Sequence, residues 1–296
     1  MHQYLRAVGF SEIRKKKEIK ELLNTIVHNS DQKEYIETEQ GTVLIEYHAL
    51  FSDSTGMTIR GELDDENQLM LDFYYPICIG KNISTNEEAG IERHADKESF
   101  GGICDDNRIG VSLIFFVQNG MEYMKNSVKK KPAKGSLPLY FSGLSLQGKI
   151  MLPIRKNETE RKKIKETALA RTQLIEAARH GDESALENLT LDEIDTYTMI
   201  SKKILKEDVF SLVDTFFMPY GIECDQYSIM GEIEEFSLET NKLTKEEIYV
   251  LVLNCNGMSV TVCINAKDLL GEPQIGRRFK GNIWLQGKLE YAYTNL

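Results

Sequence analysis

The sequence contains no run approaching the roughly 20 consecutive apolar residues that a membrane-spanning helix needs. Its longest apolar stretches are short ones such as Val111–Val117. Residues 1–30 also lack the apolar core and the small-residue cleavage site of a secretory signal, and they carry the basic run Arg14–Lys17 instead. We therefore expect a cytoplasmic protein with no membrane partner.

The sequence contains few cysteines and fewer basic than acidic residues. The five cysteines form no Cys-x-x-Cys pair, which is typical of reduced, structural thiols in a reducing compartment. The chain has 36 Lys and Arg against 46 Asp and Glu, a formal net charge of −10. Because phosphate binding depends on accumulated cations, a nucleic-acid partner is not expected.

The common catalytic and cofactor motifs are also missing. There is no phosphate-binding loop of the GxxxxGK[ST] or GxGxxG kind and no GxSxG nucleophile turn. The five histidines are scattered and form no metal-binding doublet. From motifs we therefore assign no catalytic residue, no metal ligand and no cofactor.

What the sequence does contain is a set of three short segments that recur in the same order. The pairs are Thr58–Leu63 with Ser228–Ile233, Phe116–Met121 with Leu253–Met258, and Leu144–Ile150 with Ile283–Leu289. The Asn-Gly pair precedes the Gln-Gly-Lys by 28 residues in the first copy (119 to 147) and by 30 in the second (256 to 286). The matches fit either an internal duplication or recurring hairpin chemistry.

Hydrophobic periodicity divides the chain into three parts. Residues 1–156 are predicted to form an N-terminal helix and a β-rich module with an insertion at about 72–105, residues 157–221 a helical connector, and residues 222–296 a second β module. The fold class we predict is α+β, with two small β-barrel-like modules of the OB or Greek-key kind joined by a short helical segment.

Several local predictions come from the N-terminal part. Residues 4–10 are expected to be extended, and Ser11 is expected to begin a helix that ends near Asn29. Asn119–Gly120 follows a buried-type strand and predicts a hairpin turn. The insertion is expected to be a loop, since loops are where insertions usually occur.

The connector and the last module complete the prediction. Helices are expected to begin at Asp182, Thr190 and Asp208, and the last of them carries an apolar stripe that includes Phe216 and Phe217. Residues 222–296 then give three strands, one helical turn and a long return strand, the chain order of a small OB-type barrel. One expected strand is missing, unless the return strand folds into two.

One candidate site lies in the insertion. His94, Asp96 and Cys104 fall in the charged stretch 92–106 and could serve as metal ligands or as a Cys–His nucleophile pair, because a reactive thiolate needs a neighbouring base or cation. Their spacing matches no known ligand pattern. A solvated surface loop is the alternative interpretation.

A second candidate site lies on the return strand. Strand alternation puts Arg278, Lys280 and Trp284, the only tryptophan, on one face. A basic strand beside an exposed aromatic is what single-stranded nucleic acid needs. The alternative is a tryptophan at the edge of the core with cations at the surface.

Three segments carry a resemblance to a known family. Tyr4–Phe10, Asp214–Gly221 and Lys267–Pro273 resemble an uncharacterised family of proteins from gut Firmicutes, a domain of unknown function. The resemblance implies a bacterial, cytoplasmic protein. It implies no activity and no site.

The function is therefore predicted only by class. The leading hypothesis is a non-catalytic interaction or regulatory protein with a protein partner, because small β modules without catalytic groups present surfaces. The first alternative is an enzyme with its site in residues 92–106. The second is a single-stranded nucleic-acid binder that uses the C-terminal module.

Overall fold

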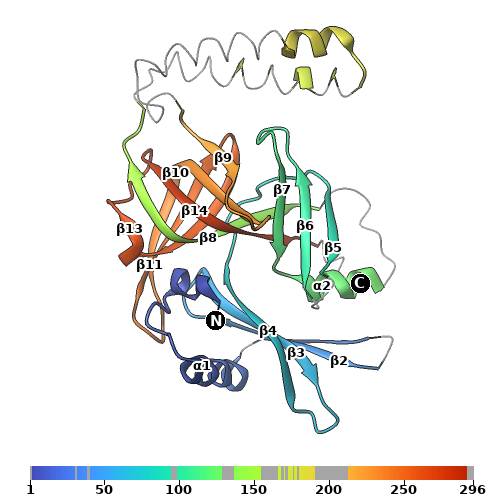
Figure 1. Ribbon diagram of the computed structural model, residues 1–296, viewed down its shortest axis with the longest axis vertical. Coiled ribbons are helices and arrows are strands. Elements are labelled where there is room, and N and C mark those ends of the chain that lie inside the picture. The colour runs from blue at the N-terminus through green and yellow to red at the C-terminus, as the bar shows by residue number, and fades with distance from the viewer. Residues whose placement is uncertain are drawn as a thin grey trace.

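The computed structural model describes residues 2–30, 32–38, 41–94, 99–128, 137–154 and 213–291, together with short pieces between 166 and 190. The described chain is mostly β and is built around a closed five-stranded barrel (Figure 1). The first half contains η1 (Gln3–Val8), α1 (Lys16–Asn29), β1 (Gln32–Glu37), β2 (Val43–Leu50), β3 (Thr55–Leu63), β4 (Leu69–Cys78), β5 (Ala89–Arg93), β6 (Phe100–Asp105), β7 (Ser112–Val117), α2 (Gly120–Val128) and β8 (Leu139–Met151). The second half contains β9 (Phe216–Pro219), β10 (Gln226–Thr240), β11 (Glu247–Cys255), β12 (Met258–Asn265), η2 (Ala266–Asp268), β13 (Leu269–Leu270) and β14 (Arg278–Leu289).

The barrel closes because β8 pairs on both sides. Strands β10, β11 and β12 form an antiparallel meander, and β14 pairs with β10. Strand β8 then pairs with β12 in parallel and with β14 in antiparallel orientation, so that no edge is left open between them. The strand missing from the predicted C-terminal module is therefore β8, and the return strand does not fold into two. The three-part division at residues 156 and 222 stays a prediction, although strands from both sides of it share this barrel.

A separate four-stranded antiparallel sheet has the order β1-β2-β3-β4 and lies below the barrel in Figure 1. Helix α1 packs on it through apolar side chains at helical spacing: Ile19, Leu22, Leu23 and Ile26 are buried. The helix begins at Lys16 and not at Ser11, because the Glu18 carboxylate accepts hydrogen bonds from the backbone N–H groups of Arg14 and Lys15. Ser11 donates hydrogen bonds to Glu246 instead.

The barrel strands separate two buried clusters. Alternate residues such as Leu251, Leu253 and Leu285 point into the barrel, whereas Val250 and Trp284 point outward into a cluster with η1, α1 and the first sheet. Both faces of β11 are therefore buried, which explains its nearly continuous apolar sequence.

Two predicted elements of the first module are wrong. Residues 4–10 are not extended but form η1, which Gly9 ends with a φ of 86°. Asn119–Gly120 does not turn a hairpin but begins α2, because the Asn119 side chain bonds to both backbone groups of Leu289 at the end of β14 and to the Glu122 carboxylate. This side chain joins the first turn of α2 to the end of β14.

The predicted insertion is not a loop. Most of its second half forms the β5–β6 hairpin, which extends through β7 to β14 and thereby joins the barrel sheet. Phe216 and Phe217 are likewise not helical. They begin β9, which pairs with β10, and Phe217 is buried in the barrel cluster with its ring 4.9 Å from that of Tyr227.

Part of the predicted connector can be followed. Residues 183–190 are helical, and the Asp182 carboxylate accepts the N–H of Ala185, as the cap prediction required. The helix predicted to begin at Thr190 lies, apart from Thr190 itself, outside the described residues, and so does the helix predicted from Asp208 as far as residue 212. One recurring segment pair, Leu144–Ile150 with Ile283–Leu289, lies on neighbouring strands of a single barrel. The described residues form one closed barrel and one open sheet.

Candidate functional site

The first candidate site is divided by the fold. Residue Cys104 pairs with Ala89 at one end of the β5–β6 hairpin, whereas His94 follows the Arg93–Phe100 pair at the other end. Cys104 is 1% exposed, and burial, with the charges of Asp106 and Glu87, raises its pKa to about 12. The thiol is therefore protonated at neutral pH. Asp96 lies outside the described residues.

No metal site is formed within the described ranges, where no three His, Cys, Asp or Glu side chains are grouped as they would need to be to hold an ion. His94 is exposed, and its Nδ1 lies 2.8 Å from the Ser99 hydroxyl. The imidazole therefore has a hydrogen-bonding partner on its own hairpin.

The second candidate site lies on one face of β14, as alternation predicted, but that face is covered. Arg278 is 6% exposed; its Nε and Nη2 donate to the carbonyl of Leu152 and its Nη1 to that of Val213. These bonds tie the end of β8 to the residues before β9. The Nζ of Lys280 lies 5.8 Å from the centre of the Phe216 ring, within cation–π range.

Trp284 is not exposed either, and this corrects the stacking interpretation. Its indole is 6% exposed and lies under η1, stacked on Tyr4 with ring centres 5.4 Å apart and also contacting His2 and Phe116. A base could not stack on it without displacing the N-terminal segment. The nucleic-acid interpretation therefore loses the residue on which it depended.

The structure shows instead that an acid, Asp225, binds the indole of Trp284. The indole N–H of Trp284 donates to Asp225 Oδ2 at 2.6 Å, and the backbone carbonyl of Asp225 accepts the N–H of Leu285. Burial raises the pKa of Asp225 above its ordinary value, partly opposed by the indole hydrogen bond and by the nearby charge of His94. His94 and Trp284, 190 residues apart in sequence, thus both act on one carboxyl that lies immediately before β10.

The Asp225 carboxyl also affects the hydroxyl of Tyr4. Burial, with the charges of Asp225 and Glu223, raises the pKa of Tyr4 to about 12. Sequence reasoning missed Asp225 because a single acid before a strand is an ordinary loop residue. Asp225 is distinguished by its contact with Trp284, on which Tyr4 packs. Because Tyr4 and Trp284 lie near opposite ends of the chain, the sequence does not show this contact.

The loop between β9 and β10 projects from this acid. Its ends are closed by the Tyr220 N–H, which donates to the Gln226 carbonyl, and Gly221 supplies a φ of 74° for the turn. Three apolar side chains of this loop and of the end of β9 face solvent: Met218 is 52% exposed, Tyr220 47% and Ile222 99%. We call Met218–Asp225 the apolar loop. Such grouped exposure in an ordered loop is a feature of binding surfaces.

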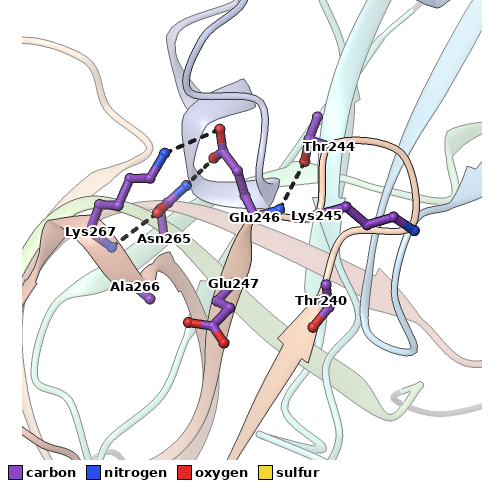
Figure 2. Close-up of a pocket in the computed structure, with 8 residues that line it drawn as sticks. All are labelled: Thr240, Thr244, Lys245, Glu246, Glu247, Asn265, Ala266 and Lys267. Atoms are coloured by element: carbon purple, nitrogen blue, oxygen red, sulfur yellow. Dashed lines mark hydrogen bonds and ion pairs between the residues drawn. The ribbon is translucent and has the colours of Figure 1, made fainter.

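A pocket of about 410 Å³ lies on another side of the barrel, between the β10–β11 loop and η2 (Figure 2). At its wall the buried Glu246 carboxylate accepts hydrogen bonds from the N–H and hydroxyl of Ser11 and from the amide of Asn265 at 2.5 Å. The Nζ of Lys267 lies 3.6 Å from it. Burial alone would raise the pKa of Glu246, but these bonds outweigh it and hold the pKa below its ordinary value.

The polar groups around this pocket hold the N-terminal segment. Asn241 donates to the carbonyl of Val8, and the Thr244 hydroxyl donates to that of Gly9. Arg6 forms an ion pair with Asp268 at the end of η2. We call this set of contacts, with those of Glu246, the N-terminal latch. It fixes η1 over Trp284 and so builds the aromatic surroundings of Asp225.

The first sheet carries a buried ion pair that sequence reasoning also missed. Arg60 Nε donates to Glu46 at 2.6 Å, and both side chains are at most 2% exposed. His48 Nε2 lies 3.1 Å from the same carboxylate and its Nδ1 3.0 Å from the Thr58 hydroxyl. Burial would raise the pKa of Glu46, but the His48 hydrogen bond and the Arg60 charge hold it below its ordinary value. The guanidinium of Arg60, whose charge this carboxylate balances, lies beside Gly120 at the start of α2.

The described residues thus define a mostly β protein whose closed barrel carries an acidic, aromatic site at one end. The chain belongs to the family described as a domain of unknown function from an E. rectale gene description (DUF3881), whose model matches residues 5–287. This confirms the resemblance to an uncharacterised family. Neither the curated proteins nor the solved structures gave a match. Within the described part of the chain, every helix is too short or too polar to cross a membrane.

Proposed function

We propose that the chain is a non-catalytic, cytoplasmic interaction protein that binds a protein partner through the apolar loop. The observation that carries the proposal is the 99% exposure of Ile222 in a loop closed by its own hydrogen bonds. A large apolar side chain held in water lowers solubility without adding stability. In a binding surface the same side chain is a natural anchor, because a few central apolar residues supply most of the binding energy.

The barrel is an appropriate platform for such a loop. The β10–β11–β12 meander, the short η2 and the return strand β14 support assigning it to the OB kind of Greek-key barrel, and the recurring segments support an internal duplication. Rigid strands present loops with little loss of conformational entropy on binding. We infer that the barrel positions the apolar loop and that the N-terminal latch fixes its base.

The test is capture by the tagged full chain from an extract of cells that produce it, with every retained molecule identified by mass spectrometry. Ile222→Ser removes the anchor, and Ile275→Ser is its matched control because Ile275 is also an exposed isoleucine, 71% accessible. We expect a stoichiometric protein partner to be retained by the wild type and by Ile275→Ser, and to be reduced about tenfold or more by Ile222→Ser. Equal retention by all three proteins would refute binding through this loop.

A further inference from the structure

The apolar loop lies in an unusually one-sided stretch of charge. Between Lys206 and Lys242 the sequence contains no Lys, Arg or His. The described part of that stretch carries the acids Asp214, Glu223, Asp225, Glu232, Glu234, Glu235 and Glu239. On the apolar loop itself the charged side chains are the acids Glu223 and Asp225, and acids attract partners of the other sign and repel phosphate groups. The partner that fits this loop is therefore cationic, and nucleic acid and anionic membranes do not fit it.

The geometry narrows the cationic group. Glu223 is exposed on the loop, and Asp225 lies at its base with its Oδ2 held by the indole of Trp284. Tyr220 is half exposed on the same loop. Carboxylates beside aromatic rings suit a planar guanidinium, which pairs with carboxylates in a fork and also stacks on rings. An ammonium group gains less from both contacts.

The chain supplies few cations of its own to this place. His94 is near enough for its charge to influence Asp225, and Lys280 is held over Phe216 at the far end of β9. The Lys280–Met230–Phe216 row of the sheet lies two residues along β10 from the Ser228–Met218 pair, where the apolar loop begins, and four from the Gln226–Trp284 pair, where it ends. Within the described residues, His94 is the cationic side chain that contributes to the pKa of Asp225.

We propose that the apolar loop recognises a partner segment in which an arginine side chain lies beside an apolar side chain, the guanidinium binding between Glu223 and Asp225 and the apolar group binding Ile222. The proposal rests on the proposed function and gives its partner a chemistry. Asp225 is the specificity-determining residue of the pair, since it is the carboxyl that the aromatic cluster holds in place.

The test uses defined peptides and the full-length protein. The probe is a fluorescein-labelled peptide in which arginine and leucine alternate with serine, compared with the same peptide carrying lysine or glutamate in place of arginine. We expect anisotropy to show saturable binding of the arginine peptide, about threefold or more weaker binding of the lysine peptide, and none of the glutamate peptide. Raising the salt from 0.05 to 0.5 M should weaken the arginine peptide on the order of tenfold, because the Debye length falls several-fold.

Matched variants separate this site from the general attraction of a protein with a net charge of −10. Asp225→Asn keeps an oxygen for the Trp284 indole and removes the charge, and Glu235→Gln removes one exposed charge elsewhere on β10. We expect Asp225→Asn to weaken the arginine peptide on the order of tenfold, the usual effect of losing one strong ionic hydrogen bond. Glu235→Gln should change it less than about twofold.

A second readout locates the binding. Trp284 is the only tryptophan and contacts Asp225, so its emission should shift when the arginine peptide binds. Equal weakening by Asp225→Asn and Glu235→Gln, or an unshifted emission, would overturn the arginine proposal. A captured partner that needs Ile222 but is indifferent to Asp225→Asn would overturn the same proposal and leave the proposed function standing.

Discussion

At the scale of single residues, the chain keeps one carboxyl where it costs stability. Most of the buried acids are compensated: Glu46 has Arg60 and His48, and Glu246 has Ser11 and Asn265. Asp225 has one indole donor against substantial burial, and its pKa is raised, not lowered. Residues that destabilise a fold are commonly retained for function, which is the physical reason for placing Asp225 in the binding site.

The first prediction concerns this cost. A carboxyl whose pKa is raised by folding destabilises the folded protein above its folded pKa and contributes nothing below its unfolded pKa near 3.9. Asp225→Asn should therefore be more stable than the wild type at pH 7, by up to about 1 kcal/mol, with the advantage vanishing near pH 3.5. Urea unfolding at both pH values measures it. A variant less stable than the wild type at pH 7 would show that the carboxylate is structural.

At the scale of elements, alternation predicted strands well and their partners poorly. Strands β10, β11, β12 and β14 are the three strands and the return strand expected in residues 222–296, because each has apolar residues in register with a buried face. The role of β8 in closing the barrel was not predictable, because its partners lie more than 100 residues later in the chain. Phe216 and Phe217 were misassigned because a short apolar run fits a helix or a strand equally until its partner is known.

The candidate site shows the same limit. Sequence chemistry selected His94 and Trp284, which both influence Asp225 in the structure, but it grouped them with Cys104 and Arg278 instead. The acid that joins them was visible only after the N-terminal latch placed Tyr4 over Trp284. A contact between residues as far apart in sequence as Tyr4 and Trp284 produces no local pattern from which it could be predicted.

The second prediction concerns the latch. The folded pKa of Glu246 is lowered, so its stabilising effect is complete above its unfolded pKa, near 4.3, and is lost as the pH falls through the folded pKa. Glu246→Gln should cost about 1–3 kcal/mol at pH 7, since charged hydrogen bonds to Ser11 and Asn265 are weakened. The difference from wild type should shrink between pH 5 and pH 3 in urea titrations. Glu247→Gln, its exposed neighbour, should show no such trend, and a constant difference at all pH values would contradict the assignment.

At the scale of the whole molecule, the barrel and the first sheet share their buried surfaces. The outward residues of β11 and β14 pack with α1, η1 and β3, while the inward residues of the same strands fill the barrel. Polar contacts add to this: the Gln118 amide donates to the Cys78 carbonyl and to the Gln286 side chain, joining β4 to the barrel sheet. Neither unit can lose its packing without exposing a face of the other.

The last prediction follows from that shared surface. Ile59 is fully buried on β3, outside the barrel, and Ile59→Ala should destabilise the protein by about 2–5 kcal/mol through lost burial and a cavity. If the two units unfold together, far-ultraviolet circular dichroism and Trp284 emission will report the same lowered midpoint, as a two-state transition requires. Ile222→Ser, which changes only an exposed side chain, should leave that midpoint within about 0.5 kcal/mol of wild type. An early transition by circular dichroism with unchanged Trp284 emission would mean that the first sheet unfolds alone and that the latch, not the shared core, holds Trp284 and Asp225 in place.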